Sequence, residues 1–191
     1  MRIVGGMWRG RPIQAPEGRG TRPTTDRMRE SIASIVLSSR DLDMSGLAVL
    51  DAFAGSGAVG LELLSRGAAS CTFCERNRKT AALVRSNCIA LGADDATWRV
   101  VCGDVGKLVR RHLWGSPFDV VFLDPPYAMS TASVQSLVED MAEEGLLREQ
   151  CLLIYEHAAN TPEIQLGILE KLRTKSMGMS SVDVLRMRGN A

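Results

Sequence analysis

The sequence predicts an α/β fold, a mostly parallel seven-stranded sheet with helices on both faces. Two observations support this prediction. Short apolar runs of strand length alternate with longer segments whose apolar residues repeat at helical spacing, an alternation typical of parallel sheets. The chain has 191 residues, 45% of them hydrophobic, which suits one domain burying roughly 70% of its unfolded surface. We expect a single domain over residues 1–191, with an N-terminal extension and helix over 1–39 and a core over 40–191.

The expected strands are continuous apolar runs, because strands buried on both faces lose the alternation of exposed ones. They lie near residues 47–51, 70–74, 97–102, 118–123 and 151–155, with two more within 168–187. Three helices are indicated by apolar residues at helical spacing. These residues are Met28, Ile32, Ile35 and Val36 in the first, Leu61, Leu63 and Leu64 in the second, and Ala81, Val84, Cys88 and Leu91 in the third. Residues 1–23 favour a basic hairpin arm, and Thr24 or Thr25 can cap the first helix.

The most specific chemical signal follows the strand at 118–123. Directly after it come Asp124, Pro125, Pro126 and Tyr127. A carboxylate, a stiff turn and an aromatic ring are therefore expected at the carboxyl end of a strand, where open α/β sheets bind ligands. Asp124 and the Pro125 carbonyl can accept both N–H bonds of a flat amine while Tyr127 stacks on its ring. We predict that these four residues are catalytic; the alternative is a turn capped by Asp124 with Tyr127 in the core.

A glycine motif follows the first strand. Gly55, Gly57 and Gly60 satisfy G-x-G-x-x-G between a strand and a helix, where glycines let the backbone approach a ligand closely. The motif serves dinucleotides and S-adenosylmethionine alike. Because Asp51 ends the strand and three residues precede Gly55, the pocket would contain an acid that repels a pyrophosphate. The same acid suits the cationic methionine end of S-adenosylmethionine, so a methyl donor is favoured over NAD.

Acids stand at or just past the ends of four successive strands. They are Asp51, Glu75, Asp104 and Asp124. Glu75 is placed to bind both ribose hydroxyls, and Asp104 to meet an adenine amino group. A single acid of this kind is commonly a helix cap. Four at one sheet edge describe one ligand laid across that edge, with Asp124 at the reacting end.

Two stretches, Asp51 to Gly57 and Asp124 to Tyr127, resemble those of Rossmann-like class I methyltransferases acting on exocyclic amino groups. Two N-terminal segments, residues 1–11 and 22–30, resemble one family specifically, the RsmD family of bacterial 16S rRNA guanine-N2 methyltransferases. The similarity runs from Met1 to about Glu156. Beyond it the match fades: members often finish in a strand carrying an aromatic residue, and residues 182–187 contain none.

The resemblance implies that a methyl group passes in line from S-adenosylmethionine to a guanine amine of 16S rRNA. The partner would be this rRNA within an assembling or assembled small ribosomal subunit, and no metal is implied. The donor's methionine end would lie over Asp51 and Gly55–Gly57, with Thr24 or Thr25 closing over it. The complete predicted cofactor site comprises Thr24, Thr25, Asp51, Phe53, Gly55, Ser56, Gly57, Glu75, Arg76, Asp104 and Val105.

Arginine is concentrated at the N-terminus. Residues 1–30 contain seven Arg and three acids, a balance of +4 in a chain whose net charge is +1. Clustered arginine beside a catalytic edge favours phosphate binding, with a solvated arm as the alternative. The predicted RNA-binding residues are Arg9, Arg11, Arg22 and Arg27.

Other features argue for a cytoplasmic protein, with a monomer favoured. No long apolar core follows Arg2 as in a signal peptide, and Asp51, Glu62 and four glycines in residues 46–64 argue against a membrane span. Five cysteines fit a reducing compartment and are expected in the core. The pair Cys71 and Cys74 lies in a strand, where residues three apart face opposite sides, so a metal site is not expected. His112 and His157 are expected at the surface or in structural roles.

The residues alone leave the acceptor open. Asp-Pro-Pro-Tyr also serves adenine N6 and cytosine N4, and a protein glutamine is chemically close. A nicotinamide-dependent oxidoreductase and a binding-only RNA module are the alternatives from other functional classes.

Overall fold

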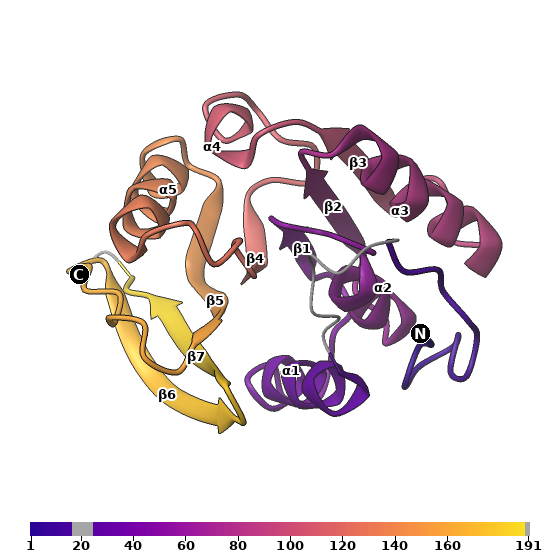
Figure 1. Ribbon diagram of the computed structural model, residues 1–191, viewed down its shortest axis with the longest axis horizontal. Helices are drawn as coiled ribbons and strands as arrows, with labels where there is room; N and C mark the ends of the chain where they lie inside the picture. Colours follow the sequence, from indigo (N-terminus) through magenta and orange to yellow (C-terminus); the bar gives the residue numbers. More distant parts are fainter. Residues whose placement is uncertain (17–24, 190–191) are drawn as a thin grey trace.

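The computed structural model describes residues 1–16 and 25–189 (Figure 1). The strands are β1 (Ala48–Asp51), β2 (Ser70–Glu75), β3 (Trp98–Cys102), β4 (Phe118–Leu123), β5 (Leu147–Ala158), β6 (Leu169–Met177) and β7 (Ser180–Met187). The helices are α1 (Asp26–Ser38), α2 (Ala58–Ser65), α3 (Arg78–Leu91), α4 (Val105–Leu108) and α5 (Thr131–Glu143). None of these helices is long and apolar enough to cross a membrane, a finding that covers the described residues only.

The seven strands form one sheet in the order β3-β2-β1-β4-β5-β7-β6. Strands β1 to β5 pair in parallel, whereas β7 runs antiparallel to both β5 and β6. The predicted α/β sheet of seven strands is confirmed, and it is mixed. Strand β5 extends beyond the expected 151–155 at both ends. Its polar start, residues 147–150, gives no apolar signal, and its far end is held by pairing with β7.

Helices cover both faces of the sheet, as predicted. Helices α1, α2 and α3 pack on one face and α4 and α5 on the other, and each face has its own apolar core. Cys71 belongs to the first core and Cys74 to the second, so the two thiols face opposite sides. The expectation that all five cysteines are buried is wrong for Cys102, which is exposed because β3 is an edge strand.

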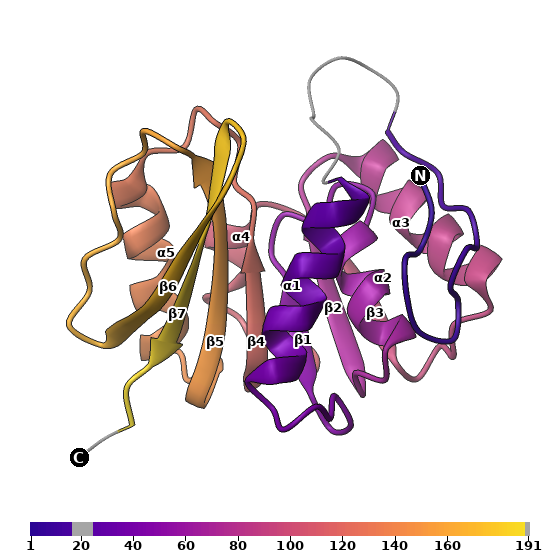
Figure 2. The ribbon, with the colours of Figure 1, turned by 90° about the horizontal axis from the view of Figure 1, so that it is seen from below.

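Residues 1–13 form a strap over α2 and α3 (Figure 2). Its two limbs meet in an antiparallel bridge between Arg2 and Pro12. The Glu62 carboxylate of α2, which is 1% exposed, accepts hydrogen bonds from the backbone N–H groups of Val4 and Gly5, each at 2.8 Å. A buried carboxylate with these partners attaches the strap to the helix that follows the glycine motif.

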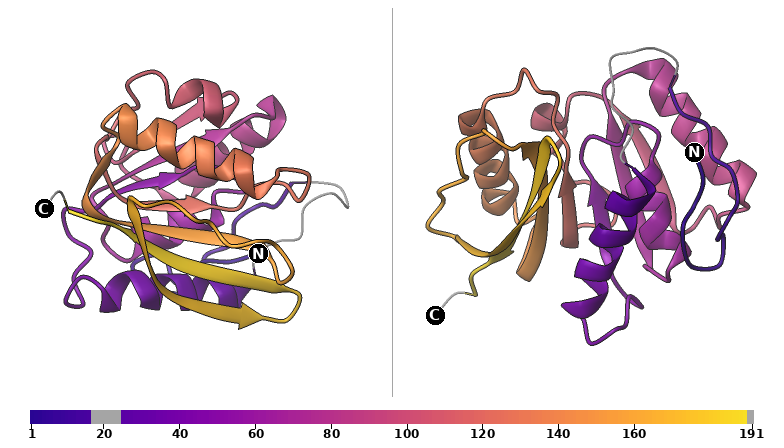
Figure 3. Two further views of the ribbon diagram at one scale, coloured as in Figure 1. Left: turned by 90° about the vertical axis from the view of Figure 1, so that its left-hand side faces the viewer. Right: turned by 60° about the horizontal axis from the view of Figure 1, so that its bottom comes forward.

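Strand β6 contains one extra residue. Lys171 pairs with Leu185 and Arg173 with Val184, so Leu172 has no partner in β7. A bulge of this kind changes which face the following side chains occupy. Figure 3 shows the β6–β7 hairpin at one edge of the sheet, with α1 on the neighbouring face.

Candidate active site

Four carboxylates meet at the carboxyl edge of the sheet. They are Glu75 at the end of β2, Asp51 at the end of β1, Asp124 just past β4, and Glu156 near the end of β5. Because these strands are neighbours in the order β2-β1-β4-β5, the four side chains form an acidic row. Three of them are predicted site residues. Glu156 is not, although it follows an apolar run in the same way as the others.

Asp51 is buried, with an exposed fraction of 1%. Its Oδ2 accepts a hydrogen bond from the Gly60 N–H at 3.1 Å, whereas no described residue bonds its buried Oδ1. Burial raises the pKa of Asp51 to about 7, and the nearby charge of Glu75 adds to the shift. A buried oxygen that lacks a partner is costly, so this site favours a ligand that brings a hydrogen-bond donor or a positive charge.

Asp124 lies next in the row. Burial raises its pKa to about 8, and the charges of Glu156 and Asp51 raise it further. The hydrogen bonds of the described residues include none to its carboxylate. The middle of the acidic row therefore contains two carboxyl groups whose ionised forms the described part of the chain stabilises poorly.

The glycine motif is positioned by this row. The Gly55 N–H donates to Glu75 Oε2 at 3.0 Å, and Gly60 donates to Asp51. Gly57 precedes α2 with φ at +77°, and a Cβ there would lie 2.9 Å from Val84 Cγ1, so only glycine fits. The acids and glycines predicted from separate signals are thus connected by hydrogen bonds.

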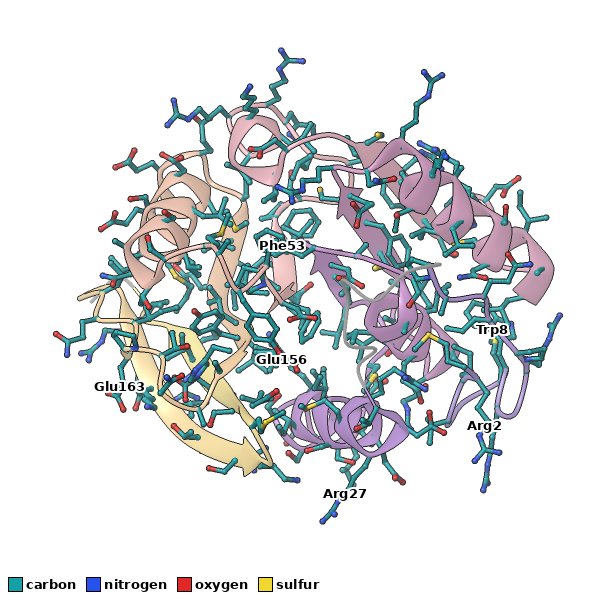
Figure 4. All side chains as sticks on the ribbon, viewed as in Figure 1. Arg2, Trp8, Arg27, Phe53, Glu156 and Glu163 are labelled. Atoms are coloured by element: carbon teal, nitrogen blue, oxygen red, sulfur yellow. The ribbon has the colours of Figure 1, made fainter. Side chains whose placement is uncertain are left out.

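The other predicted cofactor residues differ in burial and contacts. Asp104 is exposed and caps α4 by accepting from the Lys107 N–H, while Val105 is buried. Phe53 is half-buried beside the core of the α4 and α5 face, and Figure 4 places it, with Glu156, near the middle of the molecule. Arg76 is exposed.

Two further predicted residues lie where the glycine loop meets the N-terminal part of the chain. Ser56 Oγ lies 3.4 Å from Met1 Sδ, which links the loop to the strap. Thr25 caps α1 by accepting from the Met28 N–H at 3.2 Å, in agreement with the predicted helix start. Thr24 and Arg22 lie outside the described residues.

The Asp-Pro-Pro-Tyr turn opens into a pocket of about 650 Å³. Pro125, Pro126 and Tyr127 line one side, and the end of β5 lines another. Tyr127 is 75% exposed, which excludes the alternative of a core tyrosine and leaves its ring available for stacking. We call this space the acceptor pocket.

A stacked pair of rings also lines the acceptor pocket. The Tyr155 and His157 rings lie 4.8 Å apart at an angle of 27°. His157 Nε2 is 3.3 Å from Asp183 Oδ2, and both side chains are almost fully buried. His157 therefore has the expected structural role and also lines the pocket.

The predicted RNA-binding arginines differ in their contacts. Arg9 and Arg27 are exposed, and Arg27 projects outward from α1 (Figure 4). Arg11 donates hydrogen bonds to the carbonyls of Leu91 and Ala90 at the end of α3. Arg11 therefore stabilises the packing of the strap, whatever else it binds.

Comparison with known proteins connects this site to a family. Residues 1–186 match the family described as conserved hypothetical protein 95. Ribosomal RNA small subunit methyltransferase D of Escherichia coli strain K12 is 35% identical over 160 residues, covering 82% of this chain and 74% of that protein. The protein of the same name from Haemophilus influenzae is 30% identical over 181 residues, covering 95% and 91%.

The fold agrees with these sequence matches. The solved structure of HI0767 from Haemophilus influenzae has a TM-score of 0.81 at 26% identity, covering 98% of each chain. The resemblance that the N-terminal segments and the two strand-end motifs predict is confirmed, whereas the expectation that it fades after Glu156 is wrong, because the family match continues to residue 186. This chain belongs to the RsmD family of ribosomal RNA small subunit methyltransferases.

Proposed function

We propose that this protein transfers a methyl group from S-adenosylmethionine to the exocyclic N2 of a guanine in 16S rRNA. One observation carries the proposal: Asp124, whose carboxylate no described residue bonds, directly precedes Pro125, Pro126 and the exposed Tyr127, which line the acceptor pocket. The carboxylate and the Pro125 carbonyl can accept both N–H bonds of the amine. The ring can stack on the base that carries it.

The acidic row suits the methyl donor. S-adenosylmethionine supplies an electrophilic methyl carbon on a cationic sulfur. Asp51 would hold the cationic methionine end, and its unbonded Oδ1 fits that role. Glu75 would bind the ribose hydroxyls, and its present bond to the Gly55 N–H already fixes it against the glycine loop. Gly55–Gly57, Phe53, Ser56, Arg76, Asp104, Val105, Thr24 and Thr25 complete the proposed cofactor site.

Asp124 would act on the acceptor amine. Accepting an N–H bond concentrates the nitrogen lone pair, which conjugation with the ring otherwise withdraws. This needs the ionised carboxylate, whereas burial and neighbouring charge raise the pKa of Asp124 to about 8. A cation bound in the row would lower this pKa and so favour the ionised carboxylate of Asp124. Asp124 can then take up the proton that the amine loses.

The acceptor pocket would receive the base. A guanine must leave its stack, which costs a few kcal/mol unless its loop is already open, and stacking on Tyr127 would return roughly 1–3 kcal/mol. A volume of about 650 Å³ lies within the range of roughly 300–1,000 Å³ usual for ligand sites. Orientation of the amine then supplies much of the rate enhancement.

The test is methylation of 16S rRNA, both naked and in small ribosomal subunits, with a radiolabelled methyl donor, followed by digestion to nucleosides. The expected product is N2-methylguanosine, formed far more slowly with Asp124→Ala. N6-methyladenosine or N4-methylcytidine would overturn the guanine assignment. Calorimetric titration with S-adenosylhomocysteine and with NADH separates a methyltransferase from an oxidoreductase, and binding of NADH alone would overturn the proposed cofactor.

A further inference from the structure

A polar groove of about 450 Å³ runs between α1 and the edge strand β6. It lies on the sheet face covered by α1. Its lining residues are Arg27, Glu30, Ser31, Ser34, Ile35 and Ser38 of α1 with Arg173 and Lys175 of β6. We call it the α1–β6 groove.

The α1 wall of the groove is a polar stripe. Arg27, Ser31, Ser34 and Ser38 are spaced by four, three and four residues, which places them on one helix face. The apolar residues of α1 pack into the core on the opposite side. The stripe presents a guanidinium and the hydroxyl groups of Ser31 and Ser34, which can donate hydrogen bonds to phosphate oxygens, while the Ser38 hydroxyl donates to the Ile35 carbonyl.

The β6 wall owes its cations to the bulge at Leu172. Arg173 lies opposite Val184 and Lys175 opposite Val182; both valines belong to the core on the α1 face. Arg173 and Lys175 therefore face α1. Lys171 lies before the bulge, faces the other side, and is bonded to Glu163 at 2.7 Å.

The charge in the groove is largely unmatched. Three cations face one carboxylate, Glu30. The ion pairs among the described residues include none made by Arg27, Arg173 or Lys175. Lys175 Nζ donates to Ser31 Oγ at 2.7 Å, which orients the ammonium across the groove and leaves it further N–H donors.

The β6 wall of the groove lies near the active site. Lys175 and Glu156 both pair with Val182, from its two sides. Since neighbouring strands lie about 4.8 Å apart, the backbones of these two residues are about 10 Å apart. A nucleic acid that reaches the acceptor pocket would therefore pass within reach of the groove.

We infer that the α1–β6 groove binds the phosphate backbone of the rRNA beside the methylated nucleotide, an inference that rests on the proposed function. Unmatched cations with hydroxyl donors recognise phosphate. The groove assigns to the tail after Glu156, through Arg173 and Lys175, a role in substrate binding. It also places Arg27 in the same phosphate-binding groove as two cations from the other end of the chain, Arg173 and Lys175.

The experiment compares three proteins over a salt series in binding to naked 16S rRNA: the wild type, Arg173→Gln/Lys175→Gln, and a control. The control, Arg148→Gln/Arg186→Gln, removes the same charge from side chains outside the groove that are half exposed and paired with Asp119 and Glu170. Titration with S-adenosylhomocysteine and a thermal melt show that each variant is folded. Ser34→Asp, which puts a carboxylate into the groove, is a second variant.

Two lost phosphate contacts should reduce the slope of log affinity against log salt by roughly 1.4 to 1.8. At about 0.15 M salt this is a loss of roughly 10-fold or more in RNA affinity, with turnover at saturating RNA and cofactor affinity unchanged. Ser34→Asp should also weaken RNA binding.

If the groove variant has the same salt slope as the wild type, the groove does not bind RNA phosphates. The same conclusion follows if the control variant loses as much RNA affinity as the groove variant. The groove variant could instead lose affinity for an acidic protein of the small subunit while its RNA binding stays unchanged. That result would show that the groove binds a protein and not RNA. If the wild type binds RNA through the groove but does not methylate it, the proposed function is wrong and the assignment of the groove to RNA binding is kept. If the wild type methylates guanine while the groove variant binds RNA normally, the proposed function is kept and the assignment of the groove to RNA binding is wrong.

Discussion

The acidic row and the N-terminal strap are both charged regions predicted as functional, but they differ in how their charge is matched. In the strap, Arg2 pairs with Asp26 and Arg11 bonds the last carbonyls of α3. In the row, burial raises the pKa values of Asp51 and Asp124, and the charges of neighbouring carboxylates raise them further. The comparison teaches that unmatched charge in the fold, rather than charge density along the chain, marks a place for a ligand.

The largest expected effect comes from the reacting end of the row. Asp124→Ala should lower turnover roughly 100- to 1000-fold, as does loss of one transition-state hydrogen bond elsewhere, and should spare affinity for S-adenosylhomocysteine. Single-turnover methylation with a calorimetric titration measures both. Asp140→Ala removes an acid of α5 that pairs with Arg110 and is the control. Should Asp124→Ala lose cofactor affinity as well, Asp124 belongs to the cofactor site.

The other end of the row should affect binding. Glu75→Ala is expected to weaken S-adenosylhomocysteine binding by roughly 10- to 100-fold, about 1.5–3 kcal/mol for a charge-assisted bond, with little change in fold stability. Asp104→Ala removes an exposed cap and should weaken binding less. Calorimetric affinities decide the matter, and an unchanged value for Glu75→Ala would remove that residue from the site.

Tyr127 tests whether the pocket beside the row receives a base. Tyr127→Ala should raise the KM for RNA and lower turnover by roughly 5- to 100-fold in total, in line with about 1–3 kcal/mol of stacking. Because the side chain is 75% exposed, the melting temperature should stay constant. Tyr127→Phe keeps the ring and should keep much of the activity. If Phe is as damaging as Ala, the hydroxyl group matters and stacking does not.

The raised pKa of Asp124 should make the free energy of unfolding depend on pH. The pKa of Asp124 is raised from 3.8 to about 8, so the folded chain binds this proton more tightly than the unfolded chain. Stability from this group is therefore complete below about pH 4 and is lost as pH rises to about 8. Each pKa unit corresponds to about 1.4 kcal/mol, and 1 kcal/mol shifts the melting temperature of such a domain by about 2–4 °C.

Asp124→Asn cannot lose this proton. Its melting temperature should therefore rise relative to wild type by several degrees between about pH 5 and about pH 8.5, measured without ligand. Asp140→Asn should show no such trend. A difference that stays constant over this pH range would mean that Asp124 is already ionised in the free protein.

The smallest effect is expected in the strap. Arg9→Gln should reduce the salt slope of RNA affinity by roughly 0.7 to 0.9, the amount for one phosphate contact, and leave the melting temperature unchanged. Arg11→Gln should lower the melting temperature, because Arg11 bonds the end of α3. If Arg9→Gln leaves the slope unchanged, phosphate binding by the strap itself is excluded.

The sequence predicted the parts of this site that follow from chain order. An acid that comes after a buried run must lie at the carboxyl edge, and this rule located Asp51, Glu75 and Asp124. Glu156 also follows an apolar run, but the fifth strand was predicted to end at residue 155 and Glu156 was not included in the predicted site. The partners of Arg11 could not be predicted, because they lie 79 and 80 residues away and depend on how the strap packs. The bulge at Leu172 could not be predicted either. Lys171, Arg173 and Lys175 are spaced two residues apart, which in a regular strand would place all three on one face.

The attachment of the strap to Glu62 sets an order of events during synthesis. Residues 1–13 leave the ribosome before the groups that hold them, since the Glu62 carboxylate comes 57 to 58 positions after its partners and the end of α3 later still. At roughly 5–20 residues per second, seconds pass between the two. Throughout that interval the buried surface of the strap, including Ile3 and Trp8, has nothing to pack against. In a growing chain the strap therefore takes its final place only after α3 has been made.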